Sequence, residues 1–300
     1  MNLQNFTEKL VKEMKETLGE DYRINTQDIQ KNNNVMLHAV TIRCQGENVA
    51  PCIYIDDFYR EYQAGRIGIA DVEEEILHLY QKNSDGYTFD MDLLKDYDCA
   101  CPHLQGRLIN TRKNEKLLEA LPHREFLDLS LTYLLEVPGP GKSTGHIRVS
   151  REHLEYWGVD EQRLYEDATQ NMIKPGKAVL ESIGNVLKQM LKTDRKPDAP
   201  KCPAYILTNS SYQNGAVQML NKQMLKSASR ILNGDFFILP SSVHDLILLP
   251  INQAEDGGTQ AHQFASMVRE VNNTQVEEDE ILSYHVYQYC SKTGEIAIAA

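Results

Sequence analysis

The most constraining feature of the sequence is one extended apolar segment, residues 126–137, which is followed by Pro138-Gly139-Pro140-Gly141. Proline and glycine in succession interrupt regular secondary structure and mark a turn or loop. The segment is too apolar to form an exposed sheet edge, so it predicts a strand in the interior of a sheet. Residues 146–149 have the pattern of a partner strand, and residues 204–208 are expected to pair with it as well.

Helical patterns alternate with strand patterns along the chain. Phe6, Leu10, Met14 and Leu18 form one apolar stripe of helical spacing that Gly19 ends. Further helices are expected at residues 56–64, 160–172, 179–191, 216–232 and 260–271, and strands at residues 22–29, 35–44, 49–55, 236–240 and 246–250. The two kinds of element do not follow a strict βαβ order, so the sequence predicts an α+β (mixed α/β) fold.

The length of the chain predicts two subdomains, because 300 residues exceed the usual size of one compact domain. We expect an N-terminal α+β subdomain at residues 1–112. Residues 113–300 are expected to form a C-terminal subdomain built on a mixed β-sheet with flanking helices. Inside it, residues 193–203 combine three prolines with five charges, which predicts an exposed linker.

The charge balance of the chain limits its partners. The formal net charge of −12 repels nucleic-acid phosphates and anionic lipid, and no basic patch offsets it. No apolar run approaches the roughly 18–20 residues that a membrane span requires. The N-terminus lacks the apolar core of a secretion signal, and six cysteines are too sparse for a disulfide scaffold. We therefore expect an acidic cytoplasmic protein with no cofactor and with an unknown protein as its possible partner.

Several stretches of the sequence resemble an uncharacterised family of proteins from gut Firmicutes. They are residues 32–35 (Asn-Asn-Asn-Val), 51–62 with Gly65, 107–110 (Arg-Leu-Ile-Asn), 121–123 (Leu-Pro-His), 126–129 (Phe-Leu-Asp-Leu) and 237–245 (Phe-Ile-Leu-Pro-Ser-Ser-Val-His-Asp). Residues 126–172, with Trp157-Gly158-Val159 and a helix centred on Leu164, are also similar to the YtpQ-like family of unknown function. These resemblances imply a shared fold and an intracellular bacterial origin, and they carry over no catalytic residue.

Two weak candidate sites contain a serine. Ser241, His244 and Asp245 lie between two apolar strands, and a His–Asp neighbour pair can act as a general base if a substrate is placed within reach. The alternative is a helical turn capped by Ser241, in which His244 makes a local hydrogen bond. Ser143 lies in a Gly-x-Ser-x-Gly pattern, but the expected turn joins two strands and not the strand and helix of a nucleophile elbow.

One cysteine-rich stretch is a weak candidate for metal binding. Cys99, Cys101 and His103 place three potential ligands within five residues. A zinc site usually adds a second, distant pair, because one tight cluster cannot complete a tetrahedron. The remaining cysteines have no paired spacing, so free thiols are the expected state and no metal is predicted.

Two classes of function remain open at this stage. The first is a cytosolic binding or accessory protein without catalysis, which is favoured because no motif has both the correct spacing and the correct context. The second is an uncharacterised hydrolase that uses Ser143 or His244 with Asp245. A pocket of convergent polar groups beside His244 would favour the hydrolase. A flat apolar patch would favour the binding protein.

Overall fold

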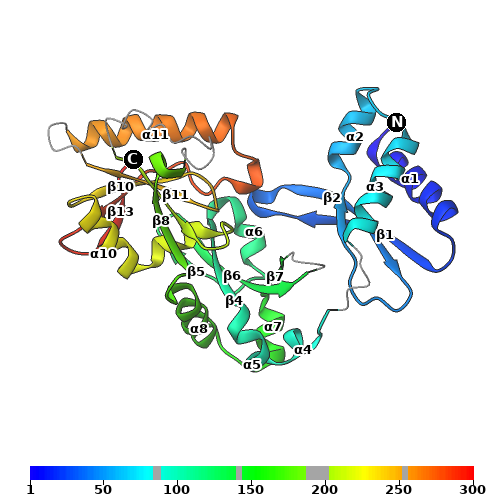
Figure 1. The fold of residues 1–300 in the computed structure, drawn as a ribbon, viewed down its shortest axis with the longest axis horizontal. Coiled ribbons are helices and arrows are strands. Elements are labelled where there is room, and N and C mark those ends of the chain that lie inside the picture. Colours follow the sequence, from blue (N-terminus) through cyan, green and yellow to red (C-terminus); the bar gives the residue numbers. More distant parts are fainter. Residues whose placement is uncertain (84–88, 140–143, 187–202, 252–255) are drawn as a thin grey trace. The chain divides into compact units, whose positions relative to one another are not determined.

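A computed structural model describes residues 1–83, 89–139, 144–186, 203–251 and 256–300 (Figure 1). The chain divides into two compact units. Unit 1 comprises Met1–Leu93 with Glu136–His146, and unit 2 comprises Leu94–Leu135 with Ile147–Ala300. The boundary expected near residue 112 lies within unit 2, and independent domains at 1–112 and 113–300 stay a prediction. The expected linker at 193–203 falls almost entirely outside the described residues.

Unit 1 packs helices on a small antiparallel sheet. Its elements are α1 (Leu3–Leu18), β1 (Tyr22–Gln30), η1 (Asn32–Asn34), β2 (Met36–Cys44), β3 (Cys52–Tyr54), α2 (Asp56–Gln63) and α3 (Ile69–Asn83). The sheet has the order β1-β2-β3. The apolar stripe of α1 is confirmed, because Phe6, Leu10 and Met14 are fully buried in the core of this unit. Val40 of β2 and Ile76 of α3 belong to the same core.

The first sheet, which belongs to unit 2 except for residues 136–138 and 144–146, is built around the apolar segment. Its order is β4-β6-β5, and β7 also pairs with β6. The strands are β4 (Leu104–Asn110), β5 (Arg124–Phe126), β6 (Leu129–Pro138) and β7 (Thr144–Arg148). The prediction of a buried interior strand is confirmed, since the first seven residues of β6 are buried.

The second sheet of unit 2 has six strands in the order β13-β12-β10-β11-β9-β8, and all of its pairings are antiparallel. The strands are β8 (Ala178–Ser182), β9 (Tyr205–Asn209), β10 (Phe236–Pro240), β11 (Leu246–Pro250), β12 (Tyr287–Cys290) and β13 (Glu295–Ile298). Helix α11 (Gly257–Thr274) lies along this sheet (Figure 1), and its Ala261 and Ala265 pack in one cluster with Phe237 of β10. The α+β class is confirmed.

Two expectations about the second sheet were wrong. Residues 204–208 do not pair with the apolar segment, because β4 occupies one side of β6 and β5 and β7 occupy the other; β9 instead pairs with β8 and β11. The helix expected at 179–191 begins as strand β8; residues 183–186 are helical, and residues 187–191 lie outside the described residues. Val179 and Leu180 suit a strand, and their cross-strand partners Thr208 and Leu207 of β9 lie far along the chain.

Shorter elements complete unit 2. They are α5 (Tyr97–Ala100), η2 (Cys101–His103), η3 (Arg112–Asn114), α6 (Glu115–Leu118), α7 (Arg151–Trp157), α8 (Glu161–Ile173), η4 (Gly215–Leu220), α10 (Lys222–Ile231) and η5 (Glu278–Glu280), while α4 (Asp92–Lys95) lies at the boundary between the units. Within the part of the chain that the structure describes, none of the helices has the length and apolar character that a membrane span requires.

Candidate functional site

Unit 1 contains a cavity of about 530 Å³ between α1 and the sheet. That volume lies within the ~300–1,000 Å³ range of small-molecule sites. Ala39 and Ile55, which line the cavity, are almost completely buried, and Leu3 of α1 adds a third apolar contact. Polar side chains from three elements complete the lining, among them Thr7 of α1, Asp28 of β1 and His38 of β2.

His38 is held in this lining by Asp56. One carboxylate oxygen of Asp56, Oδ1, lies 2.8 Å from His38 Nδ1, and the other accepts the main-chain N–H of His38 at 2.8 Å. A carboxylate can only accept hydrogen bonds, so Nδ1 carries a hydrogen and donates it. The main-chain N–H of Ile55 also donates to the His38 carbonyl. Asp56 therefore fixes both the orientation of the ring and the tautomer.

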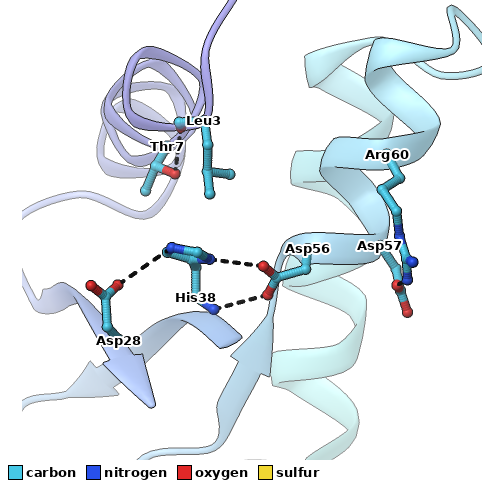
Figure 2. A network of polar contacts seen from close by, with 7 residues as sticks. All are labelled: Leu3, Thr7, Asp28, His38, Asp56, Asp57 and Arg60. Carbon is cyan, nitrogen blue, oxygen red and sulfur yellow. Dashed lines mark hydrogen bonds and ion pairs between the residues drawn. The ribbon is translucent and has the colours of Figure 1, made fainter. Parts of the chain in front are cut away.

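The other ring nitrogen of His38 lies on the side of Asp28. The two residues are cross-strand partners in the β1–β2 register, so their side chains are neighbours on one face of the sheet. The distance from Nε2 to Asp28 Oδ1 is 3.8 Å, which is too long for a hydrogen bond. Figure 2 shows the ring between the two carboxylates, below Leu3 and Thr7 of α1. Nε2 can therefore exchange hydrogen bonds or a proton with an occupant of the cavity.

The lining offers little for nucleophilic catalysis. Among the described residues around this cavity there is no serine or cysteine. The hydroxyl of Thr7 donates to the Leu3 carbonyl at 2.9 Å, within its own helix. The nearby thiol of Cys52 accepts from Gln27, and burial raises its pKa, which disfavours the thiolate. The arrangement can hold and orient a ligand, and His38 can accept or donate a hydrogen bond.

No motif in the sequence singles out His38, Asp28 or Asp56. His38 and Asp28 lie within the predicted strands 35–44 and 22–29, and Asp56 is the first residue of the predicted helix 56–64. The pairing of Asp28 with His38 would have been predictable from the register of the hairpin, because the register places opposite residues of two strands side by side. The register itself was the missing information.

The structure gives His244 a local structural role. Its Nδ1 accepts the main-chain N–H of Asn214 at 3.1 Å, and its Nε2 lies 3.4 Å from Glu280 Oε1. With Nδ1 accepting, the hydrogen of the ring lies on Nε2, which faces the Glu280 carboxylate. The main-chain N–H groups of Ser241 and Ser242 donate to the Asp245 carbonyl. The ring nitrogen that accepts is therefore already bonded within the protein.

The last serine candidate cannot be placed. Ser143 belongs to residues 140–143, which lie outside the described residues. The residues that follow, Thr144–Arg148, form strand β7. A strand at that position lacks the helix that a nucleophile elbow requires.

The cysteine-rich stretch is tied to α8 by its backbone and side chains. Cys99 is an exposed residue of α5, and Cys101 and His103 are the first and last residues of η2. The amide of Asn171 donates to the carbonyls of Cys101 and Leu104. Burial and the neighbouring Asp167 raise the pKa of the Cys101 thiol. In the residues with described positions, no three His, Cys, Asp or Glu side chains are grouped so that they could hold a metal ion.

We expect no stoichiometric metal on Cys99, Cys101 and His103. A thiol with a raised pKa must lose its proton before it can bind zinc, and one short stretch cannot complete a tetrahedral site. Elemental analysis of protein purified without chelator is the measurement. The Cys101→Ser variant is the control: one zinc per chain that disappears in this variant would contradict the prediction.

The fold and the cavity define an α+β protein with a ligand-sized polar site in unit 1. A family model described as a family of unknown function, DUF5688, matches residues 3–291, and the chain belongs to this family. No curated protein and no solved structure matches the chain. The expectation of an uncharacterised family that spans nearly the whole chain is confirmed. Similarity to the YtpQ-like family and an origin in gut Firmicutes stay predictions.

Proposed function

We propose that this protein binds a small molecule in the His38 cavity without catalysing its conversion. One observation carries the proposal: Asp56 holds His38 through two hydrogen bonds of 2.8 Å. The other ring nitrogen, Nε2, therefore faces Asp28 in the lining of the cavity. A side chain fixed before the ligand arrives loses little entropy on binding.

The composition of the cavity supports binding. Small-molecule sites combine apolar lining with a few placed polar groups that fix orientation. Leu3, Ala39 and Ile55 supply the apolar part, and His38 and Asp28 supply the polar part. The elements that carry these residues share one buried core, which gives the site a rigid base.

The hydrolase alternative has weaker support. It requires a base with an available nitrogen, whereas Nδ1 of His244 already accepts from Asn214 and Nε2 lies 3.4 Å from Glu280. At His38 the described lining supplies no serine or cysteine nucleophile. We also propose a cytoplasmic location, which the free thiols of Cys44, Cys52 and Cys290 support.

Screening a fragment library by ligand-observed NMR tests the binding function. We expect compounds whose binding weakens about three- to tenfold in His38→Ala, the effect of one lost hydrogen bond. His262→Ala is the matched control, because His262 is an exposed histidine on α11 of unit 2 and does not line this cavity. Circular dichroism of both variants checks that unit 1 remains folded. A library in which no compound distinguishes the two variants would refute the proposal.

A further inference from the structure

We infer that the ligand of the His38 cavity, whose acidic side chains Asp28 and Glu8 are exposed to solvent at its mouth, carries a positively charged nitrogen, an ammonium or a guanidinium, on a short aliphatic chain. This inference rests on the proposed binding function and specifies the chemistry of its ligand. Three features of the cavity support it: the sign of its charges, the spacing of two acceptors, and an apolar surface beside them.

The fixed charges around the cavity are negative. Asp28 of β1 and Glu8 of α1 both line it, and among the described residues of the lining there is no lysine or arginine. Gln4 donates to Glu8 Oε1 at 3.0 Å, which orients that carboxylate. The first turn of α1 also contributes a partial positive charge, equivalent to about +0.5 at a helix N-terminus. Two full carboxylate charges exceed it, so the cavity favours a cation.

The spacing of His38 and Asp28 fits one nitrogen with two N–H donors. Nε2 of His38 and Oδ1 of Asp28 are 3.8 Å apart, too far to bond to each other. A single nitrogen placed between them can lie at about 2.9 Å, the usual N–H donor distance, from both. One of its N–H groups would donate to the carboxylate and the other to Nε2 of the neutral ring, whose lone pair lies there when the hydrogen is on Nδ1 and bonded to Asp56.

Asp56 and Asp57 play different parts near this position. Asp56 is occupied by the ring and main chain of His38, so it does not compete for the ligand. Asp57 is paired with Arg60 on the exposed side of α2, and Figure 2 shows this pair pointing away from the His38 ring. Asp57 therefore provides a carboxylate next to the site that is not part of it.

The apolar residues indicate what carries the charged nitrogen. Leu3, Ala39 and Ile55 lie in the same lining as the two acceptors. Each buried methylene group contributes about 0.8 kcal/mol to transfer from water. A chain of a few methylenes therefore gains contact with this surface while its charged end reaches Asp28. A fully polar ion such as a hydrated metal gains nothing from it.

The test compares four probes of similar size: butylammonium, butylguanidinium, butyrate and n-butanol. Each is titrated into the full-length protein while the ring resonances of His38 are followed by NMR. We expect both cations to shift these resonances saturably and to bind at least about threefold more tightly than butanol, with butyrate the weakest. Asp28→Asn should weaken the cations about three- to fivefold, as for one partly exposed charge pair.

Asp57→Asn is the matched control for charge, and it should leave the cation affinity unchanged. Equal losses in Asp28→Asn and Asp57→Asn would mean that the acidic protein attracts cations without a site, and would overturn the inference. Tighter binding of butyrate or butanol, or a larger His38 shift with magnesium or zinc chloride, would also overturn it. These outcomes leave the binding function intact, because that function is decided separately by the unbiased library and His38→Ala.

Discussion

Gly215→Ala is expected to destabilise unit 2 by about 3 kcal/mol or more, the upper end of the cost of overpacking. A Cβ at this position would lie 2.2 Å from Thr208 Oγ1, 2.5 Å from the His244 carbonyl oxygen and 2.7 Å from the Asn209 main-chain nitrogen. Two of these atoms belong to the main chain and cannot rotate away. The segment must therefore separate from β9, which would break several contacts at once.

The measurement is urea unfolding followed by the fluorescence of Trp157, the only tryptophan in the chain and a residue of unit 2. Gly184→Ala is the matched control, because a Cβ at Gly184 meets no atom within 4 Å. We expect a large drop in the unfolding midpoint for Gly215→Ala and almost none for Gly184→Ala. Equal midpoints for the two variants would show that the contact at Gly215 relaxes without cost.

The consequence of Gly215→Ala should extend to His244. The main-chain N–H of Asn214, the preceding residue, donates to His244 Nδ1, and the His244 carbonyl accepts from Thr208. Both bonds depend on the close approach that the missing side chain of Gly215 permits. This part of unit 2 is a packed junction of main-chain segments, and the ring of His244 is one of its hydrogen-bond acceptors.

Elements set by local sequence were the most predictable. The stripe Phe6, Leu10, Met14 specifies one buried helix face whatever surrounds it, and the structure buries all three side chains completely. The apolarity of β6 likewise required an interior strand. Apolar patterns of this kind predict which side chains are buried, because each pattern is formed by residues a few positions apart in the chain.

Strand pairing was less predictable, because it depends on which sheet edges remain available. The strand at residues 205–209 had the correct type, but its expected partner β6 already has strands on both sides. Nothing in residues 205–209 themselves indicates that both sides of β6 are already paired. The strand β8 was mistaken for the start of a helix for a related reason, since its extended form is stabilised by pairing with β9.

The candidate site was the least predictable part. His38 meets Asp56 across 18 positions of sequence, and it meets Asp28 only through the β1–β2 register. A shift of this register by one residue would move Asp28 to the opposite face of the sheet. His244 was singled out as a candidate general base beside Asp245, and its hydrogen-bond partner Asn214 lies 30 positions away. The bond at Nδ1 therefore could not be foreseen.

Asp128→Ala is expected to cost about 3 kcal/mol of unit 2 stability, because it removes two hydrogen bonds to a charged group, each worth roughly 1.5–3 kcal/mol. The hydroxyls of Tyr287 and Ser283 both donate to its carboxylate at 2.7 Å. Tyr287 is fully buried and Ser283 is 1% exposed, so neither hydroxyl can turn to bulk water. Burial and the charge of Asp128 raise the pKa of Tyr287, which keeps this hydroxyl a donor.

A double-mutant cycle with Tyr287→Phe separates the loss of the bond from the cost of an unpaired hydroxyl. Tyr287→Phe alone removes the donor but leaves the carboxylate of Asp128 bonded to Ser283, so its cost should be smaller than that of Asp128→Ala. In the double variant the penalty for a buried unpaired tyrosine hydroxyl is absent. The two single losses should therefore sum to more than the double loss, by about 1 kcal/mol or more. Urea unfolding followed by Trp157 fluorescence gives all three values, and strictly additive losses would mean that Asp128 and Tyr287 do not depend on each other.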